Sequence, residues 1–208
     1  MDIPDSLPAQ LYLLCHDPRR RRVVTNHRSP YLLQAAALTE LLLRGRIADD
    51  GGRVRVVRDD PVGDPVLDDV LLRIAGSRPH RWRHWISRDG RATARAVLDA
   101  LESGGWVRVE RRRTLLLFTR SEVRVRDARV PKRLATRVSG ALTGPLSRVG
   151  EQQAALVALA AAGEVRTALP KAKLGAYEER VARLTERSGR AAPELRKAIR
   201  NLHASAGG

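Results

Sequence analysis

The stretch SPYLLQAAALTELLLRG, residues 29–45, is the feature that most limits how this chain can fold. Ser29 and Pro30 are typical of a helix start, and Gly45 is typical of the position after a helix end. Between these marks the residues are apolar nearly all round. Because a helix that is apolar on every face has to be covered on every face, the stretch predicts a central, buried helix.

Two further helices are predicted in the middle of the chain. In GDPVLDDVLLRIAGS, residues 63–77, Asp64 is the expected N-cap, Pro65 the first helical residue and Gly76 the end. Its apolar residues recur at spacings of three and four, so one face is expected to be buried. GRATARAVLDALESGG, residues 90–105, shows the same spacing and ends at a glycine pair.

The two ends of the chain are also expected to be helical. In the C-terminal third, proline and glycine mark the ends of segments that carry an apolar stripe or an alanine-rich run. The predicted helices there cover residues 131–142, 151–163, 173–189 and 193–204. At the other end, residues 1–28 predict a helix and then a basic loop with four consecutive arginines.

Two stretches have the character of β-hairpins. WVRVERRRTLLLF, residues 106–118, is rich in β-branched and apolar residues, and its turn is expected among the arginines. RIADDGGRVRVV, residues 46–57, contains an Asp-Gly-Gly turn signal. Residues 120–131 are interpreted as a flexible joint. The sequence therefore predicts a mainly α fold, a single globular domain over residues 1–208 with one or two hairpins.

The strongest signal in the composition is charge. The chain has 39 Lys and Arg against 23 Asp and Glu, which gives a net charge of +16. Such a surface attracts nucleic acid, anionic lipid or acidic proteins, and charge alone does not choose among them. The richness in Ala and Arg and the scarcity of Lys are typical of a GC-rich genome, and we expect a bacterial source, from an actinobacterium.

Cysteine usage and hydropathy indicate a cytoplasmic protein. The only cysteine is Cys15, so an intramolecular disulfide and a multi-cysteine zinc site are both excluded. Because Cys15 ends the apolar run LYLLC, we expect a buried thiol rather than a nucleophile. The first ten residues are acidic and contain proline, unlike a signal peptide. No stretch approaches the roughly 20 apolar residues that cross a bilayer.

Motifs that carry catalysis are missing from the sequence. There is no GxSxG, P-loop or GxGxxG pattern. His80 and His84 have helical spacing, but no acidic third ligand lies close to them in the sequence. Asp64, Asp68 and Asp69 are explained by a helix cap and a solvated face. We therefore expect no enzyme activity, no cofactor and no metal.

The stretch RPHRWRHWISRDGRATAR, residues 78–95, contains the best candidates for anion binding. Arg91 and Arg95 are four residues apart, so they share one face near the start of a helix. The positive end of the helix dipole disfavours a cation there by about 0.3–1 kcal/mol, unless an anion is bound. A helix N-terminus with arginine side chains is a good phosphate site. The alternative is that both are solvated or paired with Asp89 or Asp99.

The two tryptophans of this stretch are expected to differ. Trp85 is predicted to lie in the core, whereas Trp82 is predicted to be the more exposed of the two. Arg81 and Arg83 flank Trp82 and form a second candidate anion site with it, and Arg88 belongs to the same candidate surface.

Four segments of the chain, in order, resemble the Golgi phosphoprotein 3 family of peripheral membrane proteins. TELLLRGRI, residues 39–47, matches the family's ELxLRGRI, and PVGDPVLDDVL, residues 61–71, matches PTGDxxLDEAL. The pair Trp85–Ile86 matches a WI. GGWVRVERRRTLLLF, residues 104–118, matches a hairpin that ends in an apolar FLLF. The order and spacing hold over roughly residues 7 to 200.

The resemblance implies a helical bundle around a central helix, a projecting β-hairpin and no catalysis. Family members associate with one another through that hairpin. In this chain the corresponding apolar residues are Val107, Val109, Leu115 and Leu117.

The resemblance also implies a lipid site, which this chain matches only in part. Eukaryotic members bind phosphatidylinositol 4-phosphate through a Trp and an Arg around the central helix and two Arg before the hairpin. Here Thr25 stands at the Trp position and Gln34 at the first Arg position. Arg91 matches one of the paired arginines, while Ala94 falls on the other, with Arg95 one place later.

These observations predict a non-enzymatic peripheral protein that binds anionic lipid, with a headgroup like that of phosphatidylinositol 4-phosphate, at the inner face of the plasma membrane. A homo-oligomer through residues 106–118 is the expected assembly. One alternative is a DNA-binding regulator, because residues 91–113 resemble a winged-helix unit with a helix and a basic hairpin. Another is a protein–protein adaptor without lipid contact.

Overall fold

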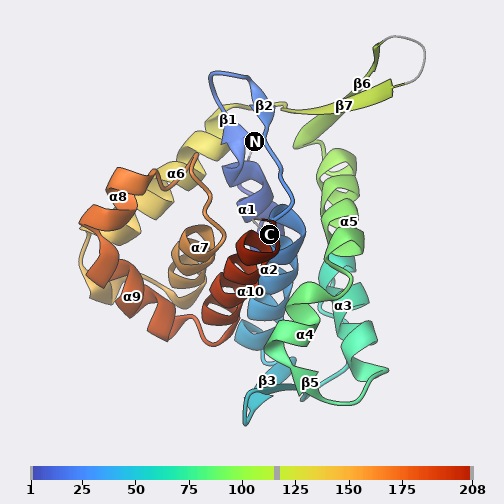
Figure 1. Cartoon of the computed structure of the whole chain (residues 1–208), viewed down its shortest axis with the longest axis vertical. Coiled ribbons are helices and arrows are strands. Elements are labelled where there is room, and N and C mark those ends of the chain that lie inside the picture. The colour runs from blue at the N-terminus through green and yellow to red at the C-terminus, as the bar shows by residue number, and fades with distance from the viewer. Residues whose placement is uncertain (1, 115–117, 207–208) are drawn as a thin grey trace.

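The computed structural model describes residues 2–114 and 118–206, and helix α2 (Ser29–Leu43) runs through its middle (Figure 1). Every residue from 32 to 41 is buried, so the predicted central helix is confirmed. The helix begins at Ser29 instead of being capped by it. The Ser29 hydroxyl accepts a hydrogen bond from the Asn26 amide, 3.0 Å away, and is not available to cap the helix.

Other helices cover α2 and form a mainly helical fold, as the sequence predicts. One group that contacts α2 is α1 (Leu7–Leu14), α7 (Glu151–Ala162) and α10 (Ala191–Ala206). The other is α3 (Pro65–Ala75), α4 (Trp82–Ser87) and α5 (Gly90–Ser103). Outside α7 lie α6 (Arg129–Thr143), the 3-10 helix Leu146–Arg148, α8 (Lys171–Ala176) and α9 (Glu178–Arg187). Among the described residues, no helix is both long and apolar enough to span a membrane.

The predicted helix over residues 173–189 is two helices in the structure. The backbone of Tyr177 leaves the helical region, with φ −119° and ψ 25°, and α9 starts at the next residue. Gly175 weakens the first helix, and Glu178 and Glu179 favour a new helix start because carboxylates interact well with the positive end of the dipole.

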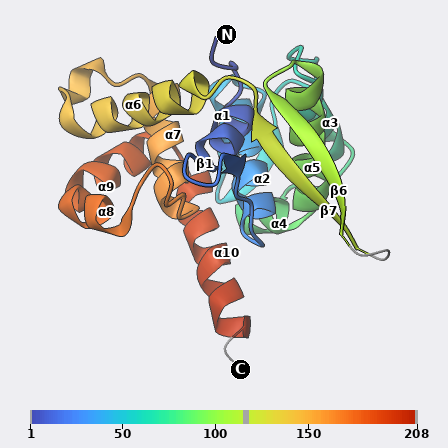
Figure 2. The ribbon, with the colours of Figure 1, turned by 90° about the horizontal axis from the view of Figure 1, so that it is seen from above.

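The projecting hairpin is longer than predicted. Strands β6 (Val107–Thr114) and β7 (Phe118–Val125) pair antiparallel and extend away from the helices (Figure 2). The expected bounds 106–118 contain the first strand and only the first residue of the second, and the first half of the expected joint, residues 120–125, belongs to the second strand. The reason is its period-two pattern, in which Val123 and Val125 pair with Val109 and Val107. Leu115 and Leu117 lie outside the described residues.

The second predicted hairpin is present and gains a third strand. β3 (Ile47–Asp50) and β4 (Arg53–Val56) pair around two glycines with positive φ, and β5 (His80–Arg81) adds to β4. The basic loop near the N-terminus is closed by two short strands, β1 (His16–Asp17) and β2 (Arg22–Val23).

Candidate anion-binding site

The residue that precedes α5, Asp89, has an unusual backbone conformation. Its φ of 56° lies in the left-handed region, and it stands at the N-cap position. Its side chain makes no capping hydrogen bond to the described part of the helix. The carboxylate contacts Arg88 Nε at 3.3 Å and Arg73 Nη1 at 3.8 Å. The Asp89 carboxylate is therefore held by arginines of neighbouring segments and not by the amides of α5.

Gly90 brings the start of α5 against the start of α2. A Cβ at this position would lie 2.8 Å from the carbonyl oxygen of Pro30 and 3.2 Å from its Cβ. Only glycine permits this approach of two backbones without a shift. The contact places the first residues of α5 beside the loop that precedes α2.

An open cavity of about 640 Å³ lies at this junction, and we call it the α5 cavity. It is lined by His27, Pro30, Tyr31, Ile86, Ser87, Asp89, Gly90, Arg91, Ala92 and Leu202. Arg91 is exposed and stands in the first turn of α5. In the described part of the chain its side chain makes no ion pair. The α5 cavity therefore combines a helix N-terminus and the unpaired Arg91 with the Asp89 carboxylate, which Arg73 and Arg88 engage.

Arg95 lies one turn further along α5. It is exposed and likewise has no acidic partner among the described residues, but it does not line the α5 cavity. The alternative pairing of Arg91 and Arg95 with Asp89 or Asp99 is not formed among the described residues, and the Asp89 carboxylate contacts Arg88 and Arg73 instead.

Gln34 is not part of the cavity. It is 2% exposed, and its side-chain oxygen accepts a hydrogen bond from the Thr93 hydroxyl. The prediction of Gln34 as a ligand contact is wrong for this conformation because its side chain is sealed between α2 and α5. Thr25 is exposed in the loop before α2, outside the lining of the α5 cavity.

Trp82 is buried, so its predicted exposure is wrong. It is 1% exposed, and its Nε1 donates to Asp49 Oδ1 at 2.7 Å. The short helix α4 packs between α2 and α10, which leaves its tryptophans inside. Trp85, at 2% exposed, is in the core as predicted.

A second open cavity, which we call the arginine–histidine cleft, lies next to the first. It measures about 590 Å³ and is lined by Arg53, His80, Arg81, Arg83, His84, Ser87 and Arg88. Ser87 lines both cavities. Sequence reasoning identified Arg81, Arg83 and Arg88 but missed Arg53, which pairs with Arg81 across β4 and β5. The Arg-Val-Arg-Val alternation of β4, with every other residue turned to solvent, was the available signal.

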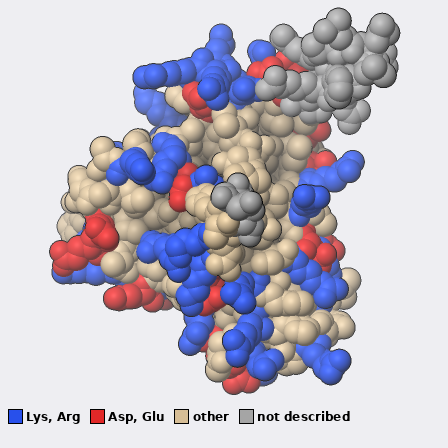
Figure 3. All heavy atoms as spheres, viewed as in Figure 1, with Lys and Arg blue, Asp and Glu red and all other residues tan. Residues whose placement is uncertain are grey.

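Lys and Arg side chains cover much of the face seen in Figure 1. Figure 3 shows them gathered over the β1–β2 loop and in the lower half, over α4, α10 and the small β3–β5 sheet. Beside the cleft, a further hollow shares Arg53, Arg81 and Arg83 with it. That hollow adds Arg190 and Lys197 from the α10 region, which pair with Asp49 and Glu194, so its added positive charge is largely balanced.

The hairpin residues fall into different environments. Val107 is fully buried at the base of the hairpin, so its side chain is not available to a second copy of the chain. Val109 is half-buried and opposite Val123.

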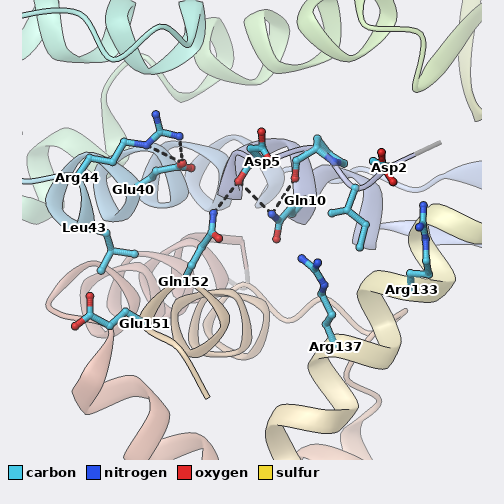
Figure 4. Close-up of a pocket in the computed structure, with 12 residues that line it drawn as sticks. Asp2, Asp5, Gln10, Glu40, Leu43, Arg44, Arg133, Arg137, Glu151 and Gln152 are labelled. Atoms are coloured by element: carbon cyan, nitrogen blue, oxygen red, sulfur yellow. Dashed lines mark hydrogen bonds and ion pairs between the residues drawn. The ribbon is translucent and has the colours of Figure 1, made fainter. Parts of the chain in front are cut away.

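A third cavity, of about 600 Å³, lies between α1, α2, α6 and α7 (Figure 4). The side-chain amides of Gln10 and Gln152 both donate to the carbonyl oxygen of Asp5, at 3.2 and 2.7 Å. Buried Glu40 accepts from Arg44 at 2.5 Å, although burial raises the pKa of Glu40 above its usual range. Acidic and basic groups are mixed in this lining, which does not favour a single type of ion.

Comparison with known families gives one result. The model of the family described as Golgi phosphoprotein 3 (GPP34) matches residues 7–202, nearly the whole chain. A search of curated proteins gives no match.

Proposed function

The chain belongs to the Golgi phosphoprotein 3 family, and from that premise we propose that it is a non-enzymatic peripheral membrane protein that binds anionic lipid. The observation that carries the proposal is Arg91. It is exposed, lines an open cavity and stands in the first turn of a 14-residue helix without an acidic partner in the described chain. A cation is mildly unfavourable there unless an anion binds to it.

The headgroup that we propose is a phosphate-bearing one, like that of phosphatidylinositol 4-phosphate. The α5 cavity offers the Arg91 guanidinium, the His27 imidazole and the free amides at the start of α5. Tyr31 and Leu202 add an apolar wall. With Gln34 sealed in the core, this site holds fewer charges than the family pattern implies.

The shape of the protein supports a docking side. In Figure 2 the β6–β7 hairpin and the C-terminal part of α10 both extend toward the lower side of the picture, with the hairpin at an angle to α10. Leu202, near the end of α10, is also a wall of the α5 cavity. We propose that this side faces the membrane and that the outer part of the hairpin contributes to self-association.

Sedimentation with vesicles tests the proposal. At 150 mM salt, we expect the protein to bind vesicles that contain phosphatidylserine or phosphatidylinositol 4-phosphate and not vesicles of phosphatidylcholine alone. Arg91→Gln should weaken binding several-fold, and Arg95→Gln should weaken it less. Arg148→Gln is the control, because it removes one exposed charge from the 3-10 helix between α6 and α7.

Binding that does not depend on anionic lipid would contradict the proposal. If Arg91→Gln and Arg148→Gln lose vesicle binding equally, the binding is due to general charge attraction and not to the α5 cavity. Tight binding of random duplex DNA at this salt, with no vesicle binding, would instead favour the DNA-binding alternative.

A further inference from the structure

The arginine–histidine cleft has a lining without a single carboxylate. Its walls consist of four arginines, two histidines and one serine. They come from β4, β5, α4 and the turn after α4, which are up to 35 positions apart in the sequence. In a chain with 23 Asp and Glu, a pocket of seven side chains without an acid concentrates positive charge at one place.

The arginines of the cleft keep most of their donors free. Arg81 and Arg83 are exposed and make no ion pair with any residue that the structure describes. Arg53 uses Nη1 to donate to the carbonyl oxygen of Pro79, at 3.1 Å. Arg88 is the exception, because its Nε contacts Asp89, whose carboxylate lies outside the lining.

The two histidines form a fixed pair at the wall of the cleft. The rings of His80 and His84 are stacked, with centroids 4.1 Å apart and an angle of 24° between their planes. The Trp85 ring stands at a steep angle to both, with its centroid 5.4 Å from that of His84 and 5.9 Å from that of His80. His84 Nε2 is buried and has no hydrogen-bond partner among the described residues. The stacked rings and Trp85 therefore hold the histidine wall of the cleft in place.

We infer that the arginine–histidine cleft is a binding site for a phosphomonoester dianion, held by the guanidinium groups of Arg53, Arg81 and Arg83 with His84 at its wall. Planar guanidinium groups match phosphate oxygens in pairs, and a doubly charged group balances several of them at once. The cleft has room for more than one phosphate group, so a phosphomonoester with an organic part fits it. The inference goes beyond the proposed function, since only Ser87 is shared with the α5 cavity.

Two probes distinguish the possible sources of the phosphate. Glycerol 3-phosphate, titrated by calorimetry, reports on a soluble phosphomonoester. Phosphatidic acid in phosphatidylcholine vesicles presents the same group on a lipid, and phosphatidylserine vesicles of equal surface charge lack it. Saturable binding of glycerol 3-phosphate supports the site. Additional preference for phosphatidic acid over phosphatidylserine identifies a lipid source, whereas equal vesicle binding identifies a soluble ligand.

The decisive variant is Arg81→Gln with Arg83→Gln, and we expect it to weaken glycerol 3-phosphate binding about tenfold or more. Lys132→Gln with Arg148→Gln removes the same charge from exposed positions near α6, and it should change the affinity less than about twofold. Arg53→Gln removes a cleft arginine that lies on β4, and it should also weaken glycerol 3-phosphate binding. This variant replaces the double variant if the double variant is unstable. No heat of binding in the wild type, or equal losses in the double variant and its control, would overturn the inference. Arg91→Gln in the same titration reports on the α5 cavity. Loss of glycerol 3-phosphate binding in Arg91→Gln, with none in the double variant, would place the phosphate there and overturn the inference, while vesicle sedimentation tests the proposed function separately.

Discussion

The side-chain oxygen of Gln34 accepts a hydrogen bond from the Thr93 hydroxyl, and this bond joins the middle of α2 to the first turn of α5. Both residues are buried, at 2% and 0% exposed. Arg73 Nη2 also reaches the Thr93 hydroxyl, at 3.4 Å. The position at which the family resemblance implies a lipid-binding arginine is thus used here to fix the helix that presents Arg91.

A double-mutant cycle should measure this bond. Gln34→Leu leaves the Thr93 hydroxyl short of a partner, and Thr93→Val leaves the Gln34 oxygen without one. Each change should cost about 1–3 kcal/mol of unfolding free energy, while the double variant should cost less than the sum. Urea unfolding provides the values. Additive effects would show that the two side chains do not interact.

Gly90→Ala should separate α5 from α2. The new Cβ would lie 2.8 Å from the Pro30 carbonyl oxygen, a backbone atom that cannot move alone, so we expect a loss of about 1–3 kcal/mol. Gly140 is the matched control, because it lies within α6 with nothing near its added Cβ. Gly140→Ala should gain about 0.5–1 kcal/mol by helix propensity. Thermal melts of both variants check the opposite signs, and a stable Gly90→Ala would contradict the close contact.

Much of the fold could be predicted because its signals are local. Asp64 caps α3 as expected, with its carboxylate accepting from the amides of Val66 and Leu67. The all-round apolarity of residues 32–41 was sufficient to place α2 in the centre, because no other position could bury it.

The site was less predictable because it depends on contacts between distant segments. Asp49, which accepts a hydrogen bond from Trp82 Nε1, is far from Trp82 in the sequence. Because a buried indole needs such a partner, exposure of Trp82 was the simpler prediction from the sequence alone. Arg53 joins Arg81 only because β5 pairs with β4, and two-residue strands leave no periodic pattern to detect.

Cys15 should resist alkylation in the folded protein. It is 8% exposed, and burial raises the pKa of its thiol to about 12. Since the thiolate is the reactive form, only about one thiol in ten thousand is reactive at pH 8. Iodoacetamide at pH 8 should label the native chain very slowly and the urea-unfolded chain quickly, with Cys15→Ser as the unlabelled control. Equal labelling rates in the two states would show that the thiol is accessible.

The stability of the free protein should fall at mildly acidic pH, in part through His84. Burial is the main cause that lowers the pKa of His84 below its usual 6.5, and neighbouring His80 and Arg88 lower it further, against Asp89. In the unfolded chain this histidine takes up a proton as the pH falls through about 6.5, while in the folded chain it stays neutral until a lower pH. Its stabilising contribution is therefore complete above pH 6.5 and is lost as the pH falls through the folded pKa.

A comparison of wild type with His84→Gln at pH 7.5 and pH 5.5 isolates this effect from His16, whose pKa is also lowered by burial. The wild type should lose more thermal stability between the two pH values than the variant does. Sulfate, which stays doubly charged over this range, should reduce the loss in the wild type, because an anion in the cleft favours the protonated imidazole and raises its pKa. Sulfate that stabilises both proteins equally at both pH values would mean that His84 does not sense an anion in the cleft.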